Sequence, residues 1–237
     1  MKISIVIRYG NSSVRLLTLL IMLVCALPLA GQETKVVRDL QLWTGVALEK
    51  KVGKDWTFSL AEEIRFKQDI SEINNYFTDA GVRYRINKNF ALEAGYRYTR
   101  DRKSDATYET LTRYNLDLRF KGQLDYISIH YRLRYQKEVE GFNLLDQGVD
   151  YEKYVRNRIR IRYDDLKKFK PYVSAEIFQL FTPNQTPEFE YVRVQGGVKY
   201  EPGKIGVFGI ALGFNRELNE VEPAMIYLLR VNYTYQF

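Results

Sequence analysis

The chain contains very few of the residues that support thiol, redox or metal chemistry. Its 237 residues include one cysteine, Cys25, and one histidine, His130. Cys25 lies in an apolar run near the N-terminus, and Val24 precedes it where a lipoprotein signal has a small residue. We therefore predict no lipidation. A mature chain that has lost this run holds no cysteine, which excludes a disulfide, a thiolate nucleophile and a cysteine metal site.

No apolar run is long enough to cross a bilayer comfortably as a helix. The longest run, Leu16–Ala30, is interrupted by a single threonine. It follows a basic segment that contains Lys2, Arg8 and Arg15. This order is typical of a secretory signal, so we predict a signal peptide over residues 1–31. An uncleaved anchor helix is the alternative.

The positive charge is not concentrated in one place. The formal net charge of +7 includes the three basic residues of the predicted signal, which leaves +4. A nucleic-acid-binding protein gathers its basic residues on one patch or helix, whereas here they are spread along the chain. We predict no nucleic-acid partner. No glycine-rich phosphate loop, metal triad or dinucleotide fingerprint occurs, so we also predict no cofactor and no metal site.

What the sequence does have is strict alternation of apolar and polar residues, together with many aromatics. From Ile127 to Gln136, apolar or aromatic residues occupy every second position, and polar residues occupy the positions between them. A period of two indicates a β-strand with one apolar and one wet face. The same pattern recurs over Trp56–Lys67, Thr112–Lys121, Val155–Tyr163 and Tyr227–Phe237.

The spacing of these strands predicts a barrel. We count eleven strands of about ten to thirteen residues, joined alternately by short turns and longer polar loops, as in an up-and-down barrel. Strands of nine to eleven residues cross a bilayer at a tilt. With 19 Tyr and 13 Phe in the chain, we predict an antiparallel transmembrane β-barrel of about 10–12 strands over residues 32–237, located in a bacterial outer membrane. The alternative is a soluble periplasmic lipocalin-like binding barrel.

Two features do not fit this prediction. Single-chain bacterial barrels have even strand numbers, whereas the count here is odd. Glu62 also falls on the apolar face in the middle of a strand. A β-bulge near Glu62–Glu63 would shift the register and turn Glu62 inward.

The C-terminal residues carry the most specific resemblance. Tyr233, Tyr235 and Phe237 resemble the last-strand signature that barrel-assembly machinery recognises, which implies this machinery and outer-membrane lipid as partners. The chain as a whole resembles the uncharacterised outer-membrane β-barrel family catalogued as domain of unknown function twenty-four-ninety. The family brings no known activity. The residues that carry this resemblance are Leu42–Gly45, Glu49–Lys51, Trp56–Leu60, Glu62–Arg65, Gly95–Tyr98 and Pro171–Val173.

The wet face is rich in arginine and predicts a cationic lumen. Alternate arginines on one strand lie about 6.5 to 7 Å apart and repel one another unless acids or anions intervene. The candidate ladder is Arg132, Arg134, Arg156, Arg158, Arg160 and Arg162. One interpretation is a narrow, porin-like path that prefers small anions. The other is a structural network in which Glu63, Glu93 and Asp117 bind some of the arginines.

We predict that the chain is not an enzyme. The rival is an outer-membrane lipid-modifying enzyme that uses Ser128 and His130, two residues apart on one face. Nucleophile and base must lie within hydrogen-bond reach, at the lipid-facing surface or rim. Here both point to the lumen, one strand step apart. The acids of the long loops, such as Glu138, Asp146 and Glu220, lack EF-hand spacing and indicate ordinary solvated charge.

Overall fold

The computed structural model describes residues 37–141, 151–182, 186–203 and 206–237. These residues fold into eleven strands, which confirms the predicted all-β barrel. The predicted signal peptide lies outside the described residues. Among those described, no helix is long and apolar enough to cross a membrane. The strands are β1 (Val37–Val52), β2 (Trp56–Lys67), β3 (Glu72–Arg85), β4 (Phe90–Arg102), β5 (Tyr108–Leu124), β6 (Ile127–Glu140), β7 (Tyr151–Tyr163), β8 (Phe169–Phe181), β9 (Glu188–Tyr200), β10 (Val207–Glu217) and β11 (Ala224–Gln236).

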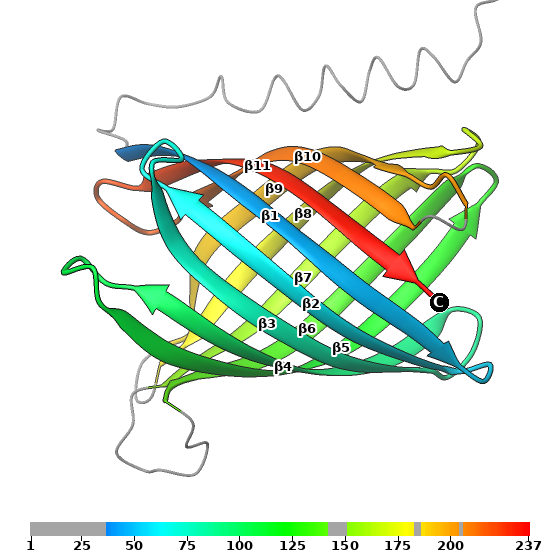
Figure 1. Ribbon diagram of the computed structural model, residues 1–237, viewed down its shortest axis with the longest axis horizontal. Helices are drawn as coiled ribbons and strands as arrows, with labels where there is room; N and C mark the ends of the chain where they lie inside the picture. The colour runs from blue at the N-terminus through cyan, green and yellow to red at the C-terminus, as the bar shows by residue number, and fades with distance from the viewer. Residues whose placement is uncertain (1–36, 142–150, 183–185, 204–205) are drawn as a thin grey trace, which may run out of the picture. The chain divides into compact units, whose positions relative to one another are not determined.

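The strands pair in chain order and close into a barrel (Figure 1). Consecutive strands are antiparallel, and β1 pairs with β11 in parallel. With an odd number of strands, the first and the last run in the same direction, so a parallel ladder must close the ring. This ladder aligns Val37 with Ala224 and Glu49 with Gln236. It ends where the Phe237 N–H donates to the Glu49 carbonyl at 3.0 Å. The parallel pairing of β1 with β11 therefore lets a barrel with an odd number of strands close.

The connections at the two ends of the barrel differ less in length than the sequence predicts. At the end where β1 finishes, the turns include 53–55 and 125–126. At the other end, the connection 141–150 is long, whereas the connection between β2 and β3 is only 68–71. Pairing of β3 with β2 begins at Glu72, within a segment whose polarity suggests a loop. The ends are called the short-turn end and the long-loop end below.

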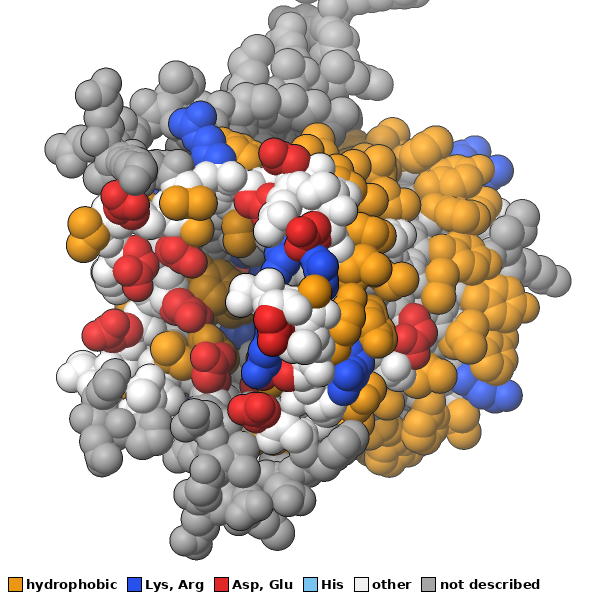
Figure 2. Space-filling view, turned by 60° about the vertical axis from the view of Figure 1, so that its left-hand side comes forward, with side chains coloured by type: hydrophobic (Ala, Val, Ile, Leu, Met, Phe, Trp, Pro, Cys, Tyr) orange, Lys and Arg blue, Asp and Glu red, His pale blue; other side chains and the backbone are white. Residues whose placement is uncertain are grey.

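Alternation separates an apolar outer wall from a polar interior. Leu60, Leu116 and Leu212 lie within strands, and their exposed fractions are 48%, 55% and 66%. On the other face, Asp117 and Glu176 are 0% and 4% exposed. Figure 2 shows hydrophobic side chains over the wall and acidic side chains gathered around the long-loop end. The barrel is therefore inverted relative to a soluble globular protein, with charge inside and apolar surface outside.

Glu62 remains on the outer wall, so the predicted bulge at Glu62–Glu63 is wrong. The β2–β3 register runs unbroken through Glu62 and shifts only between Arg65 and Phe66. The Thr78 hydroxyl donates a 2.6 Å hydrogen bond to the Glu62 carboxyl group. Glu62 therefore has a polar partner on the neighbouring strand β3, which the sequence of β2 alone does not predict.

Candidate functional site

The arginine ladder spans two neighbouring strands of the barrel interior. The β6–β7 register places Arg132 opposite Arg158 and Arg134 opposite Arg156. Like charges directly opposite one another destabilise a sheet unless acids or anions compensate them. The two strands therefore form a double row of positive charge, whose partners must come from other strands.

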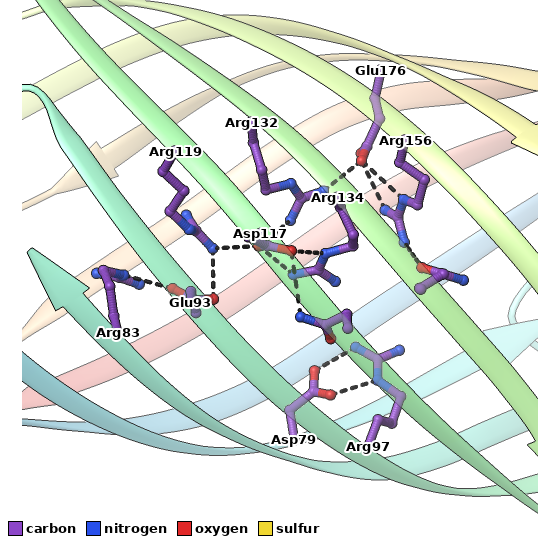
Figure 3. Close-up of polar contacts among 12 residues, drawn as sticks. Asp79, Arg83, Glu93, Arg97, Asp117, Arg119, Arg132, Arg134, Arg156 and Glu176 are labelled. Atoms are coloured by element: carbon purple, nitrogen blue, oxygen red, sulfur yellow. Dashed lines mark hydrogen bonds and ion pairs between the residues drawn. The ribbon is translucent and has the colours of Figure 1, made fainter. Parts of the chain in front are cut away.

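Asp117 of β5 is the first of these partners. Its carboxylate accepts hydrogen bonds from Arg134 Nε at 2.6 Å and from Arg134 Nη2 at 2.8 Å. Arg119 and Arg132 lie 3.2 and 3.9 Å from the same carboxylate. Figure 3 shows Asp117 lying between these three guanidinium groups. A bidentate arginine–carboxylate pair fixes the orientation of both side chains as well as pairing their charges. Asp117 therefore holds Arg134 in place in the middle of the ladder.

Glu176 of β8 is the second partner. It forms ion pairs with Arg132 and with Arg156, whose Nη2 lies 2.9 Å from the carboxylate. The Arg156 Nη1 group also donates to Gln136 at 2.9 Å. Because Glu176 and Arg132 come from β8 and β6, their contact spans β7 (Figure 3). Three ladder residues thus form ion pairs with two acids within a buried network.

The network extends around the barrel through the other inward acids. Glu93 binds Arg83 at 2.6 Å and Arg119 at 2.7 Å. The other pairs join Glu63 to Arg65 and Arg230, and Asp79 to Arg97. The predicted pairing of Glu63, Glu93 and Asp117 with arginines is confirmed. In the middle of the lumen, the inward arginines and acids therefore form the structural network that was the second interpretation of the arginine ladder.

Aromatic residues on the wet face complete this middle layer, and the sequence analysis missed them. Trp43, Phe77 and Phe178 are each at most 3% exposed. The Arg65 guanidinium lies 3.8 Å from the Trp43 ring, and Arg156 lies 4.1 Å from the Phe178 ring. A cation over an aromatic face is attracted to the ring. The sequence does contain a weak signal for these residues, because each aromatic lies two positions from a polar residue, namely Gln41, Asp79 or Glu176.

The barrel interior holds two cavities, and Arg134, Arg156 and Glu176 of the middle network line the smaller one. The cavity at the short-turn end has a volume of about 700 Å³, and the one toward the long-loop end about 400 Å³. Arg132 and Arg158 line both cavities, so the two spaces approach each other at these side chains. Any path along the barrel interior through both cavities passes this pair.

The six predicted ladder residues differ in their partners. Arg132, Arg134 and Arg156 belong to the middle network, and Arg162 Nε lies 2.7 Å from Asp164. Arg158 and Arg160 form no ion pair with an acid in the described part of the chain. Arg160 instead lies over the Tyr172 ring at 4.4 Å, and its buried Nε atom has no hydrogen-bond partner in the described ranges. Within the described residues, the ladder therefore lacks acidic partners at Arg158 and Arg160, between the middle network and Arg162.

Ser128 and His130 do not form a hydrogen-bonded pair. The buried Ser128 hydroxyl donates to the carboxylate of Asp164, in the turn after β7. His130 lines the larger cavity, and its buried Nε2 atom has no hydrogen-bond partner among the residues that the structure describes. The serine hydroxyl therefore bonds to the Asp164 carboxylate and not to the His130 imidazole.

The predicted assembly residues lie on the outer face of β11, beside the seam. Tyr235 and Phe237 are 41% and 55% exposed, and their rings stack with centroids 5.8 Å apart. Tyr233 packs against Phe208 of β10 at 4.8 Å. The Lys50 ammonium group of β1 lies 4.8 Å from the Phe237 ring. This aromatic row therefore contacts both strands that flank β11.

Comparison with known proteins gives a family and no activity. No curated protein and no solved structure matches the chain significantly. The family described as "Protein of unknown function (DUF2490)" matches residues 40–211. This match runs from β1 into β10 and covers nearly three quarters of the chain. The chain therefore belongs to the DUF2490 family.

Proposed function

We propose that the protein is an outer-membrane β-barrel whose cationic lumen forms a narrow path that prefers anions. The observation that carries the proposal is the unpaired charge of Arg158 and Arg160 inside the barrel. A fixed positive potential in a confined space concentrates anions and repels cations. The middle network makes the path narrow.

The outer wall supports the membrane location. Exposed apolar side chains occur on strands all around the barrel, including Val46, Leu92, Leu133, Ile159 and Ile210. Soluble monomers rarely expose contiguous apolar patches larger than a few hundred Å², which disfavours the lipocalin-like alternative. The strands contain 11 to 17 residues, enough for the nine to eleven that cross a bilayer at a tilt.

Fractionation tests the location. The mature protein is expected in the outer-membrane fraction, resistant to carbonate and urea washes. It is also expected to migrate differently on gels before and after boiling, because a folded barrel survives detergent. Recovery as a soluble periplasmic monomer would favour the lipocalin-like barrel instead.

Planar-bilayer recording tests the lumen. We expect small conductance steps whose reversal potential in a potassium chloride gradient shifts toward that of chloride. Arg158→Glu combined with Arg160→Glu is expected to weaken this preference. Lys167→Glu changes charge on an exposed turn at the same end, outside the residues that line the cavity, and should leave the preference unchanged.

The recording also separates the two interpretations of the arginine ladder. A folded, heat-modifiable protein without conductance would support the purely structural interpretation. A preference for cations would contradict the proposed role of Arg158 and Arg160.

A further inference from the structure

We propose that the larger cavity of the lumen is a binding site for a small anion of the diphosphate class, held by Arg158, Arg160, Lys199 and His130. The cavity is called the short-turn chamber here. The inference deepens the proposed function, because it names the ligand class of the same lumen. Its physical basis is uncompensated positive charge in a confined space.

The balance of charge in the two cavities differs. The residues that line the short-turn chamber include twelve lysines or arginines and three acids, namely Glu49, Asp55 and Glu201. The residues that line the smaller cavity include nine arginines and five acids. The short-turn chamber therefore holds the larger excess of positive charge and is the stronger candidate for an anion.

The cations of the chamber form two successive levels along the barrel. One level follows the register from Arg119 through Arg132 to Arg158. The next level follows it from Lys121 through His130 to Arg160. Neighbouring strands lie about 4.8 Å apart, and successive residues of one face about 6.5 to 7 Å apart. The Cα atoms of these basic residues are therefore about 5 to 7 Å from their neighbours along the chamber wall, a spacing that two linked phosphate groups can bridge.

Several of these half-buried groups lack partners among the described residues. Arg158, Arg160 and Lys199 form no ion pair with an acid in the described ranges. The Nε atom of Arg160 and the Nε2 atom of His130 are buried without a hydrogen bond. Burying charged or polar groups without partners is costly. A bound anion would remove this cost, because it supplies both acceptors and countercharge.

The chemistry of the donors favours phosphate groups. A guanidinium group presents N–H donors in a planar fork that matches the oxygens of a phosphate. Three uncompensated cations favour a multiply charged anion over chloride or a single carboxylate. The volume of about 700 Å³ lies within the range of small-molecule pockets. A diphosphate, free or as part of a phosphorylated small molecule, meets these conditions.

Calorimetry on the folded full-length mature chain in non-ionic detergent tests the site, with sodium pyrophosphate as the probe. Ionic strength is held constant with sodium chloride. Pyrophosphate is expected to bind with one site per barrel. Arg160→Gln combined with Lys199→Gln is expected to weaken binding at least tenfold. Arg113→Gln, which removes a buried charge from the smaller cavity only, should change binding less than twofold.

The single histidine provides a second readout that needs no substitution. In an untagged chain, the imidazole of His130 gives the only histidine signal in a heteronuclear NMR spectrum. This signal should shift saturably with pyrophosphate and not with chloride at equal ionic strength. The readout also decides the outcome if the double variant fails to fold.

Several results would overturn the inference. They are the absence of pyrophosphate binding, equal binding by the double variant, and binding of an anionic phospholipid in mixed micelles without binding of pyrophosphate. Because these measurements need no membrane current, the two proposals fail separately. Binding without conductance would refute the anion path alone, and anion conductance without binding would refute the diphosphate site alone.

Discussion

Arg158 faces Glu176 in the β7–β8 register, yet the Glu176 carboxylate pairs with Arg132 and Arg156 instead. The two arginines that flank Arg158 thus share the acid directly opposite it. This arrangement explains why the middle of the lumen is cross-linked while Arg158 stays unpaired. A single glutamate therefore sets the boundary between the cross-linked part of the ladder and the part that the proposed anion path uses.

Glu176→Gln should destabilise the barrel strongly. The substitution removes the charge that Arg132 and Arg156 share and leaves both guanidinium groups buried. Breaking a buried ion pair by removing one partner costs about 3–5 kcal/mol. The free energy of unfolding in urea, measured on the detergent-folded protein, should fall by about this amount. Glu220→Gln, in the connection between β10 and β11, is the matched control and should change it by less than about 0.5 kcal/mol.

A fall of less than about 1 kcal/mol in Glu176→Gln would contradict this role. In that case, water would have to solvate the two arginines as well as the carboxylate does. The same variant should also strengthen anion preference in bilayer recordings, because it removes a negative charge from the wall of the smaller cavity, through which the proposed path runs.

The strands could be predicted from sequence because a period of two directly reports which face a residue occupies. Alternation through Arg132 and Arg134 on β6, and through Arg156 to Arg162 on β7, placed the ladder in the interior. The contact between Arg132 and Glu176 could not be predicted, because it spans an intervening strand and joins residues 44 positions apart. It depends on side-chain reach within a curved wall, which the spacing of polar residues does not encode.

Two further predictions fail because one face of a strand can carry both polar and apolar residues. Glu62 was expected to turn inward because its neighbours on β2 are apolar, but Thr78 on β3 supplies a hydrogen bond at the outer wall. Trp43 and Phe178 were not expected in the lumen, because the wet face was assumed to be polar throughout. Both errors involve partners on another strand, which the sequence of one strand cannot show.

Phe237→Ala should reduce the amount of folded barrel in the membrane. The ring stacks on Tyr235 and lies beside Lys50 of β1, at the end of the closing seam. Loss of the ring weakens the last contacts that hold β11 to β1. Quantitative blotting of heat-modifiable protein should show a several-fold decrease, with more degradation products. Phe189→Ala, an exposed aromatic at the other end of the barrel, is the control, and equal levels in the two variants would contradict the prediction.

Asp164→Asn should change the acid sensitivity of the barrel. Asp164 lies in the turn after β7. Burial opposes its ionisation, but hydrogen bonds from Ser128 and Arg162 hold the pKa of its carboxyl group below the ordinary value. A lowered folded pKa stabilises the protein above the unfolded pKa of about 3.9. This stability is lost as the pH falls from there through the folded pKa.

The free energy of unfolding should therefore decline less steeply below about pH 4 in Asp164→Asn than in the unsubstituted protein, because the variant has already lost this contribution at pH 7. Ser128→Ala removes one of the hydrogen bonds and should show part of the same effect. Parallel pH profiles for the unsubstituted protein and Asp164→Asn would show that the turn contributes nothing.

The parallel seam can be tested by crosslinking, because the only native cysteine, Cys25, precedes the barrel and can be replaced by serine. Leu42 of β1 and Leu229 of β11 are register partners across the seam. Partners in adjacent strands lie within the roughly 4.4–6.8 Å between Cα atoms that a disulfide requires. Leu42→Cys with Leu229→Cys should therefore crosslink under mild oxidation and leave a barrel that stays compact on gels without reducing agent.

Two further cysteine pairs serve as controls for the case in which Leu42→Cys and Leu229→Cys do not crosslink. Leu48→Cys with Leu60→Cys joins antiparallel partners of β1 and β2 and should crosslink in any folded barrel. Leu42→Cys with Tyr235→Cys should not crosslink, because Tyr235 lies six residues farther along β11, about 20 Å away. Crosslinking of the β1–β2 pair without the Leu42–Leu229 pair would show that the folded chain closes in another register or remains open. The lumen would then lack the continuous wall that both proposals require, because Glu63 of β2 and Arg230 of β11 meet only when β1 lies between them.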